Sequence, residues 1–447
     1  MSNTTHNHAN YQARLDYIQG LLVDHLGVPK KNLEHIEITP IQYDPDCPFK
    51  YNNFIYRLSL PANSPVNLRF RDAKQPGSVP IPAGTSEFIL RLSNPDAADM
   101  HQQTRVQNEV GLLNLAGAAL EHLEPAVVPF VFGWGGASSE EGPGWILQEL
   151  MPGTPLHSAF RGTMSLEQKR GVLSQMAALL KALQDYALPG SITGWGGVTF
   201  DESGTIVSAP MSSVGAGPWC SLEECFRGRL QAALRQADAS PLLRGWRDNG
   251  VRERVDAFVE RGLSAQFLDL TSKEDRTIVH ADLTPDNLLY DPATGRITAL
   301  LDYDFAGILH PGYEFFRSFG HSGGRLLGWT GDATPLEQEA LALRSAKLTG
   351  RFPSPLPAPV ASPNGPQVDW ELARAWEDEL QKLDVKRPST IRGIDKVADV
   401  EEVLGSLYPW RLTNEDFLRL NPDEDQRAAL RRNAETRLIN LLGHLGF

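Results

Sequence analysis

The first 150 residues contain both helical and strand-like patterns of apolar positions. Apolar side chains recur at steps of three and four over residues 11–26, which predicts a helix with one buried face that ends at Gly27. The same spacing predicts a second helix over residues 103–120. Shorter apolar runs predict strands at residues 53–60, 87–92, 127–134 and 145–150. Because residues 151–155 (Met-Pro-Gly-Thr-Pro) break regular structure, we place a domain boundary after residue 150.

Residues 151–447 have a mainly helical pattern. Ser165 and Ser221 are each followed three residues later by Gln or Glu, a capping-box pattern that predicts a helix start at both positions. A helix is predicted at 251–270, a strand-rich segment at 277–303, and helices from there to the end. Segments rich in proline or small polar residues are expected to form loops at 61–86 and 350–366. We therefore predict a C-terminal domain of residues 151–447 that ends in a helical extension.

The strand-rich segment contains the residues best suited to chemistry. His280, Asp282 and Asn287 lie in one stretch, and Asp302 and Asp304 follow the next predicted strand. The turn between the two strands makes them a hairpin, so folding brings Asn287 and Asp302 to the same end. Asp282 lies on the loop just before Asn287. Two carboxylates and one amide are therefore expected to converge.

Such oxygen ligands suit Mg²⁺, which usually takes only one or two carboxylates from a protein. The other carboxylate is then free to orient or deprotonate a hydroxyl group, and phosphoryl transfer requires both parts. A His-x-Asp triplet and an Asp-Pro-x-x-Gly turn each occur by chance in many proteins. Here they occur with a β-branched strand before them and an Asp after the next strand, so the combination favours phosphoryl transfer over coincidence.

Composition and charge exclude several classes of protein. Of the 447 residues 41% are apolar and 22% charged, as in ordinary globular proteins. The net charge of −13 gives no basic surface for nucleic acid or an anionic membrane, and it favours cationic small molecules. The three cysteines give no sign of a disulfide framework or a zinc site, and neither a signal peptide nor a membrane span is predicted. We therefore expect a cytoplasmic protein without nucleic-acid or membrane partners.

On the residues of the 278–306 block, the sequence resembles the aminoglycoside phosphotransferase family, which shares its fold with choline kinases and protein kinases. Within that family it is most similar to the large fungal branch. The resemblance covers roughly residues 50–320. It implies an α+β, two-lobed protein-kinase-like fold. A small antiparallel-sheet N-terminal lobe (residues 1–150) would cover ATP, and a larger, mainly helical C-terminal lobe would carry the catalytic residues and the acceptor pocket.

The resemblance also implies roles for residues of the motif. Asp282 takes the position of the family's catalytic base, and Asn287 and Asp302 take the positions of its Mg²⁺ ligands. His280 corresponds to a structural histidine that packs beneath the loop. Asp304 either supports a metal ligand or assists at the metal site itself.

Nucleotide contacts are implied for the N-terminal part. Arg91, on a predicted strand, takes the position of the family's lysine, and Glu109, on the following helix, takes the position of its partner. The substitution is a departure from the family, because arginine has a planar fork that is wider than an ammonium group. The alternative is an arginine on an edge strand that faces solvent.

The segment expected to cover the phosphates is residues 49–54, which contain no glycine. Asn53, with the asparagine before it, is expected to form a tight turn whose backbone amides face phosphate, and Lys50 is expected to add positive charge there. The alternative cradle is the Gly-rich segment 133–144. Backbone groups near Glu149 and Met151 are expected to pair with adenine.

The sequence therefore predicts an ATP- and Mg²⁺-dependent phosphotransferase that acts on a hydroxyl group, or less readily an amine, of a small molecule. Two alternatives stay open: ATP use for nucleotidyl transfer or carboxylate activation, and a non-catalytic nucleotide-binding module. A protein kinase is disfavoured because no Ala-Pro-Glu-like segment follows the motif. Four aromatic residues form either a wall for the acceptor or part of the core: Trp370, Trp376, Tyr408 and Trp410.

Overall fold

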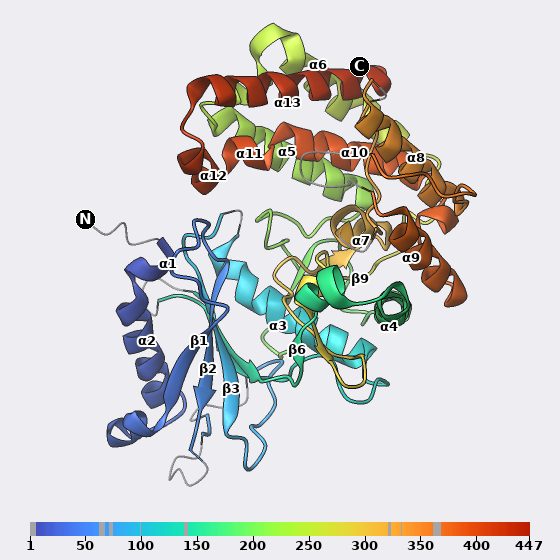
Figure 1. Cartoon of the computed structure of the whole chain (residues 1–447). Coiled ribbons are helices and arrows are strands. Elements are labelled where there is room, and N and C mark those ends of the chain that lie inside the picture. Colours follow the sequence, from blue (N-terminus) through green and yellow to red (C-terminus); the bar gives the residue numbers. More distant parts are fainter. Residues whose placement is uncertain are drawn as a thin grey trace.

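The N-terminal strands and the C-terminal helices lie at opposite ends of the structure (Figure 1). This computed structural model describes residues 6–61, 68–70, 75–98, 100–137, 142–320, 323–331, 333–360 and 368–447. The loops predicted at 61–86 and 350–366 lie partly outside the described residues, as does the middle of segment 133–144.

A five-stranded antiparallel sheet occupies the N-terminal part, in the order β1-β2-β3-β5-β4. Its strands are β1 (Glu37–Ile41), β2 (Asn53–Ser59), β3 (Glu87–Ser93), β4 (Val131–Gly135) and β5 (Trp145–Glu149). Successive side chains of a strand point to opposite faces. Leu90 and Leu92 therefore pack with α2 (Tyr11–Asp24) on one face, whereas Arg91 faces Glu109 of α3 (Gln102–Ala119) on the other.

The helices and strands predicted for this part are present, but the short helix α1 (His6–Ala9) was not predicted, and two further differences concern the sheet. The prediction omitted β1, an edge strand of five residues that contains Pro40, a residue that edge strands tolerate. It also began β4 at residue 127, whereas the strand begins at Val131, after Pro129. Proline has no backbone N–H to donate to a neighbouring strand, so it delays the start of pairing.

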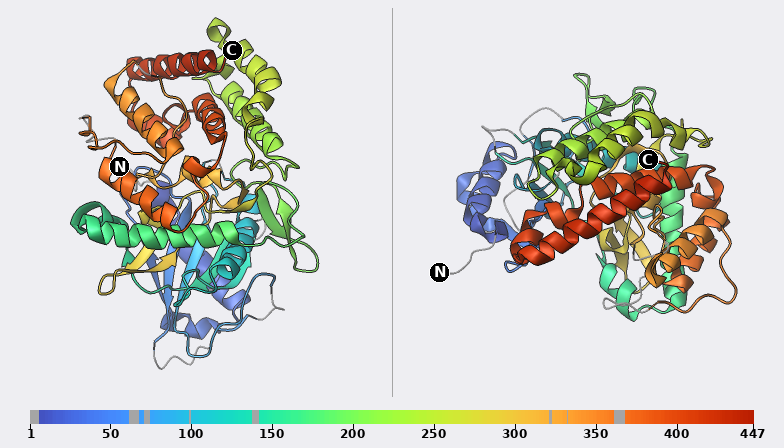
Figure 2. Two further views of the ribbon diagram at one scale, coloured as in Figure 1. Left: turned by 90° about the vertical axis from the view of Figure 1, so that its right-hand side faces the viewer. Right: turned by 90° about the horizontal axis from the view of Figure 1, so that it is seen from above.

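Helices dominate the C-terminal part, and Figure 2 shows them from two further sides. Ser165 and Ser221 cap α4 (Leu166–Asp185) and α5 (Leu222–Ala239) with their side chains, as their sequence patterns predict. The helix predicted next is shorter than expected, because α6 (Val251–Ala257) gives way to a π turn.

Short strands hold the segment that was predicted to carry chemistry. β10 (Leu288–Asp291) and β11 (Arg296–Leu300) form the predicted antiparallel hairpin. β9 (Thr277–Val279) pairs with β12 (Gly307–Leu309). The prediction that the chain is helical throughout after the motif is wrong at β12, because three residues are too few to show an alternating pattern.

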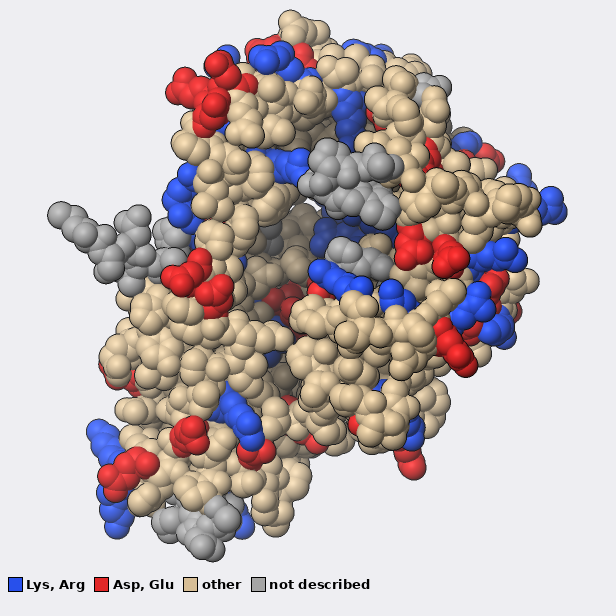
Figure 3. Space-filling view, viewed as in Figure 1, with Lys and Arg blue, Asp and Glu red and all other residues tan. Residues whose placement is uncertain are grey.

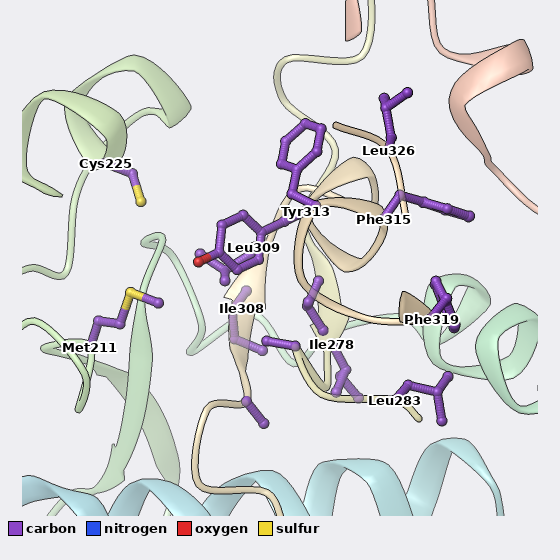
Figure 4. Close-up of a cluster of buried hydrophobic side chains, with 14 of the residues drawn as sticks. Met211, Cys225, Ile278, Leu283, Ile308, Leu309, Tyr313, Phe315, Phe319 and Leu326 are labelled. Atoms are coloured by element: carbon purple, nitrogen blue, oxygen red, sulfur yellow. The ribbon is translucent and has the colours of Figure 1, made fainter. Parts of the chain in front are cut away.

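The other described helices and strands are β6 (Thr154–Pro155), β7 (Gly197–Phe200), β8 (Ile206–Ala209), α7 (Gly312–Arg317), α8 (Pro335–Thr349), α9 (Trp370–Lys382), α10 (Ile394–Leu407), α11 (Trp410–Thr413), α12 (Glu415–Leu420) and α13 (Glu424–His444). α10 packs against α5 and α13. Side chains of β9, β12 and α7, among them Ile278, Ile308 and Phe315, form a buried cluster beside the loop that carries Asp282 (Figure 4).

Two of the four aromatic residues left open by the sequence belong to the core. Trp370 and Trp376 are 2% and 1% exposed, so they cannot line a binding site. Trp410 is 52% exposed, and both it and Tyr408 line a cavity described below.

The predicted α+β class is confirmed: a small antiparallel sheet precedes a larger, mainly helical part, as in kinase-like folds. Within the described part of the chain, no helix is both long enough and apolar enough to span a bilayer.

Candidate active site

The loop that carries Asp282 is fixed by buried hydrogen bonds. Glu314 of α7 accepts the backbone N–H groups of His280 (2.8 Å) and Ala281 (2.9 Å), and Ala281 has a left-handed backbone with φ of 62°. His280 is buried and donates from Nε2 to the carbonyl of Leu301 (3.0 Å). Burial lowers the pKa of His280, so the neutral ring is favoured. His280 thus joins this loop to the end of β11.

Asp282, Asn287 and Asp302 lie around the end of the β10–β11 hairpin. The Nδ2 of Asn287 donates to the carboxylate (2.8 Å) and the carbonyl (2.9 Å) of Asp282. The N–H of Leu301 donates to the carbonyl of Asn287 (2.9 Å), which places Asn287 next to the start of the Asp302 segment. Burial raises the pKa of Asp282, and the hydrogen bond from Asn287 and the charge of Arg317 partly oppose this effect.

Arg91 forms the link between the sheet and this hairpin. Its Nη2 lies 3.1 Å from Glu109 and 3.0 Å from Asp302. Arg91 is 5% exposed and lies on the central strand β3, so the alternative of a solvent-facing arginine on an edge strand is excluded. One terminal nitrogen of the guanidinium thus contacts both carboxylates at once.

Asp304 is buried and makes more contacts with other side chains than the sequence indicated. Its buried carboxylate lies 3.1 Å from Arg105 of α3 and accepts a hydrogen bond from the Asn53 side chain (2.7 Å). Arg105 also donates to the Oδ1 of Asn53 (3.0 Å). Sequence reasoning missed Arg105, although it lies one helical turn before Glu109 and therefore on the same face of α3.

A small cavity of about 220 Å³ lies between the β1–β2 connection and the ion-pair cluster. Asn52, Asn53, Arg91 and Asp302 line it. Residues 51–54 of the segment predicted to cover the phosphates thus line this cavity together with Arg91. The tight turn predicted at Asn52 and Asn53 is wrong, because Asn53 already belongs to β2, where it pairs with Ser93, and neither asparagine has a left-handed backbone. Glu149 and Met151, predicted near adenine, lie at and after the end of β5 and line neither this cavity nor the larger one below.

The oxygen atoms of this region fit a divalent cation. Carboxylate oxygens of Glu109, Asp302 and Asp304 lie within 4.8 Å of one another. Glu109 and Asp304 are buried against arginines, whereas the side chain of Asp302 is 37% exposed. Among the described residues, none donates a hydrogen bond to the Oδ1 of Asn287. The Oδ1 of Asp302 contacts Arg91, so the Oδ2 of Asp302 and the Oδ1 of Asn287 are the hard oxygen atoms of this pair that could bind Mg²⁺.

A much larger cavity of about 1580 Å³ adjoins the Asp282 loop at Ala281, and it is called the acceptor cavity after the acceptor pocket that the sequence resemblance implies. Its walls come from Phe49, Lys50 and Asn52 and from α5, α7, α10, α11, α12 and α13, and Figure 3 shows a hollow in this face. The backbone N–H of Lys50 donates to Asp416 (2.8 Å) and its Nζ lies 3.0 Å from Glu415, both on α12. These bonds hold the N-terminal loop against the C-terminal helices across the cavity.

Glu314 was missed by sequence reasoning, and its contacts predict a measurable role in positioning Asp282. In Glu314→Gln, the amide has only one oxygen for the two N–H groups, so a buried donor is left unpaired at a cost of about 1–3 kcal/mol. We expect a lower unfolding temperature and a lower kcat, with the KM for ATP little changed. Steady-state kinetics and thermal unfolding measure these effects.

The matched control is Glu339→Leu, which removes the one oxygen that accepts both the Val360 N–H and the Trp370 indole N–H. Glu339 is also buried and accepts a backbone N–H, that of Val360 (2.9 Å), but it packs beside Trp370 instead of the Asp282 loop. This variant should lose stability and keep its kcat. Equal losses of kcat in both variants would show that Glu314 acts only through global stability.

Comparison with known proteins was made by sequence and by structure. Among solved structures, an ethanolamine kinase from Plasmodium vivax is 12% identical, with 96% of this chain and 89% of that chain covered and a TM-score of 0.46. An aminoglycoside phosphotransferase in complex with streptomycin and ATP is 11% identical, with 94% and 97% covered and a TM-score of 0.45. A search of the curated proteins found no significant match. At this level of similarity the solved structures do not indicate a substrate.

The comparison with family models is decisive for membership. The model of the phosphotransferase enzyme family (APH) matches residues 81–351. This range is more than half of the chain and includes β3, α3 and the whole β9–β12 segment. The chain therefore belongs to the phosphotransferase enzyme family.

Proposed function

We propose that this protein is an ATP- and Mg²⁺-dependent phosphotransferase that phosphorylates a hydroxyl group of a small molecule. The observation that carries the proposal is the convergence of Asp282, Asn287 and Asp302 at one hairpin end, between the small cavity and the acceptor cavity. Membership of the fungal branch of the family, expected from the sequence resemblance, stays a prediction.

In this proposal Asp282 accepts the proton of the acceptor hydroxyl, and Asn287 holds its carboxylate in position. Asn287 and Asp302 would hold Mg²⁺, which when bound supplies charge neutralisation for the transferred phosphoryl group. Arg91, oriented by Glu109, contributes positive charge beside the phosphates. His280 supports the loop.

The proposed nucleotide and acceptor contacts are divided between two lobes. Residues 1–150 form the nucleotide-covering lobe in this proposal, with Asn53 at the phosphate loop and backbone groups near Glu149 and Met151 at adenine. Residues 151–447 form the catalytic and acceptor-binding lobe. Asp304 contributes by holding Arg105 and Asn53 beneath the metal site.

One observation keeps the non-catalytic alternative in view. Arg91 contacts Asp302 directly (3.0 Å), so the arginine competes with a cation for the same carboxylate. In a catalytic protein, Mg²⁺·ATP would either displace this contact or use the other carboxylate oxygen of Asp302. In a non-catalytic protein the contact persists, and any nucleotide binding is independent of Mg²⁺.

The experiment measures ADP formation from ATP with and without Mg²⁺, using water as the acceptor so that no acceptor need be known. We expect slow, Mg²⁺-dependent ADP formation that EDTA abolishes, and a shift of the unfolding temperature with Mg²⁺·ATP. AMP as the product would support nucleotidyl transfer or carboxylate activation. Nucleotide binding without any ADP formation would support the non-catalytic alternative.

A further inference from the structure

The walls of the acceptor cavity carry charges of both signs. The cations are Lys50, Arg229, Arg317, Arg325, Arg411 and Arg437, and the carboxylates are Asp96, Glu401, Glu402, Glu415 and Asp416. In Figure 3, blue side chains border the hollow in this face. Which of these charges remain unpaired determines what kind of molecule the cavity accepts.

Most of the carboxylates are already used by protein groups. The ion pairs are Arg229 with Glu401 (2.9 Å), Arg437 with Glu402, and Lys50 with Glu415 (3.0 Å). Asp416 is held by the backbone of Lys50 (2.8 Å) and by Arg419 (3.0 Å). Among the described residues, Asp96 is the wall carboxylate that lacks a cationic partner, whereas three wall arginines lack a carboxylate.

Two of these arginines, Arg317 and Arg325, are oriented without being neutralised. The Nε of Arg325 donates to the carbonyl of Phe316 (3.0 Å), and the Arg317 guanidinium lies 5.2 Å from the centre of the Phe305 ring. Both side chains are exposed in the cavity wall, and no described carboxylate lies within ion-pair distance of either. Their terminal nitrogens are therefore available to a bound molecule.

The two guanidinium groups influence each other and the predicted base. Desolvation by the cavity walls lowers the pKa of Arg325, Glu402 opposes this effect, and the positive charge of Arg317 lowers the pKa further. The charge of Arg317 also lowers the pKa of Asp282, against the burial that raises it. Arg325 donates to the carbonyl of Phe316, the residue before Arg317, so the two arginines are neighbours in the wall. Ala281, next to Asp282, lines the same cavity, so a group bound at the two arginines shares this cavity with the Asp282 loop.

Resting on the phosphotransferase function proposed above, we infer that the acceptor carries an oxyanion, either a carboxylate or a phosphate monoester, in addition to its hydroxyl, and that Arg317 and Arg325 bind this oxyanion. Guanidinium groups bind such oxyanions through paired, charge-assisted hydrogen bonds. A cationic acceptor would meet two unpaired positive charges beside the catalytic loop. The net charge of −13, taken alone, favours cationic molecules. At this site the two unpaired arginines favour an anionic group instead.

Thermal unfolding of the full chain tests the inference with defined probes. Inorganic phosphate at matched ionic strength tests the oxyanion without any carbon skeleton. Glucose 6-phosphate, glucuronate, glucosamine and glucose then compare phosphate, carboxylate, ammonium and neutral groups on one skeleton. We expect inorganic phosphate and at least one of the two sugar oxyanions to raise the unfolding temperature. Apparent Kd values should rise about tenfold for each guanidinium removed in Arg317→Gln, Arg325→Gln and the double variant.

The matched control is Arg235→Gln, because Arg235 is an exposed arginine of α5 that does not line the cavity. The response to oxyanions should be unchanged in this variant. The inference is overturned if inorganic phosphate has no effect, if the oxyanion response survives in the double variant, or if glucosamine gives the largest response.

A parallel titration with Mg²⁺·ATP separates this inference from the proposed function. An oxyanion response that depends on the two arginines, without any response to Mg²⁺·ATP, would contradict the phosphotransferase proposal and still support oxyanion recognition. A Mg²⁺·ATP response without an oxyanion response would support the proposed function and overturn the inference about the acceptor.

Discussion

Asp282→Asn is expected to lower kcat by about 10²- to 10⁴-fold, the range that a general base contributes. The amide has nearly the shape of the carboxylate, and its oxygen can still accept the hydrogen bond from Asn287. It cannot, however, take up the proton of an acceptor hydroxyl. Steady-state measurement of ADP formation reports the loss.

The same variant should keep its fold and its affinity for Mg²⁺·ATP. Burial raises the pKa of Asp282, which means that the ionised carboxylate is disfavoured in the folded protein, so its replacement by a neutral amide should not lower the unfolding temperature. Asp286→Asn is the matched control, because Asp286 lies in the same segment and is exposed in an ion pair with Arg161 (3.0 Å). A wild-type kcat in Asp282→Asn would rule out the base assignment.

The local part of the site could be predicted from the sequence because a hairpin is a local structure. Asn287 directly precedes β10, and Asp302 follows the end of β11. The turn between these two antiparallel strands is therefore enough to bring the two residues together. Arg91 and Glu109 were reached only through the family resemblance, because nothing in the periodicity of β3 and α3 says that these two elements face each other. The alternation along β3 explains afterwards why Arg91, between Leu90 and Leu92, faces the helix.

The other residues of the site depend on contacts between distant parts of the chain. Glu314 binds Ala281 across 33 positions, and Arg105 binds Asp304 across 199. No local pattern identifies such partners, and a buried glutamate on a short helix has no distinctive spacing. The acceptor cavity was not predictable for the same reason, since its walls combine Phe49, Lys50 and Asn52 with helices near the C-terminus.

Asp302 and Asp304 lie two residues apart in the sequence but have different surroundings in the structure. Asp304 is buried and holds Arg105 and Asn53, so it joins the sheet, α3 and the segment after the hairpin. Asp302 is partly exposed and has a left-handed backbone, with φ of 67°. Residues other than glycine adopt this conformation only where the surrounding structure compels it, and such positions are common at functional sites.

This division predicts that Asp302→Asn raises the Mg²⁺ concentration needed for half-maximal activity by at least about tenfold, because even the partners that merely orient metal ligands are worth that much. Asparagine tolerates the left-handed backbone, so the unfolding temperature should change little. The measurement is a Mg²⁺ titration of ADP formation at fixed ATP, with nucleotide affinity measured in EDTA as a reference that should be unaffected.

Asp304→Asn is the informative comparison, because it changes a buried carboxylate that lies 3.1 Å from Arg105. Loss of one partner leaves the Arg105 charge buried without full compensation, which costs about 3–5 kcal/mol when a buried pair is broken. We therefore expect a large drop in unfolding temperature and a smaller effect on the Mg²⁺ midpoint. The reverse pattern, an unchanged Mg²⁺ midpoint in Asp302→Asn and a shifted one in Asp304→Asn, would show that the buried carboxylate is the metal ligand and that Arg91 retains Asp302.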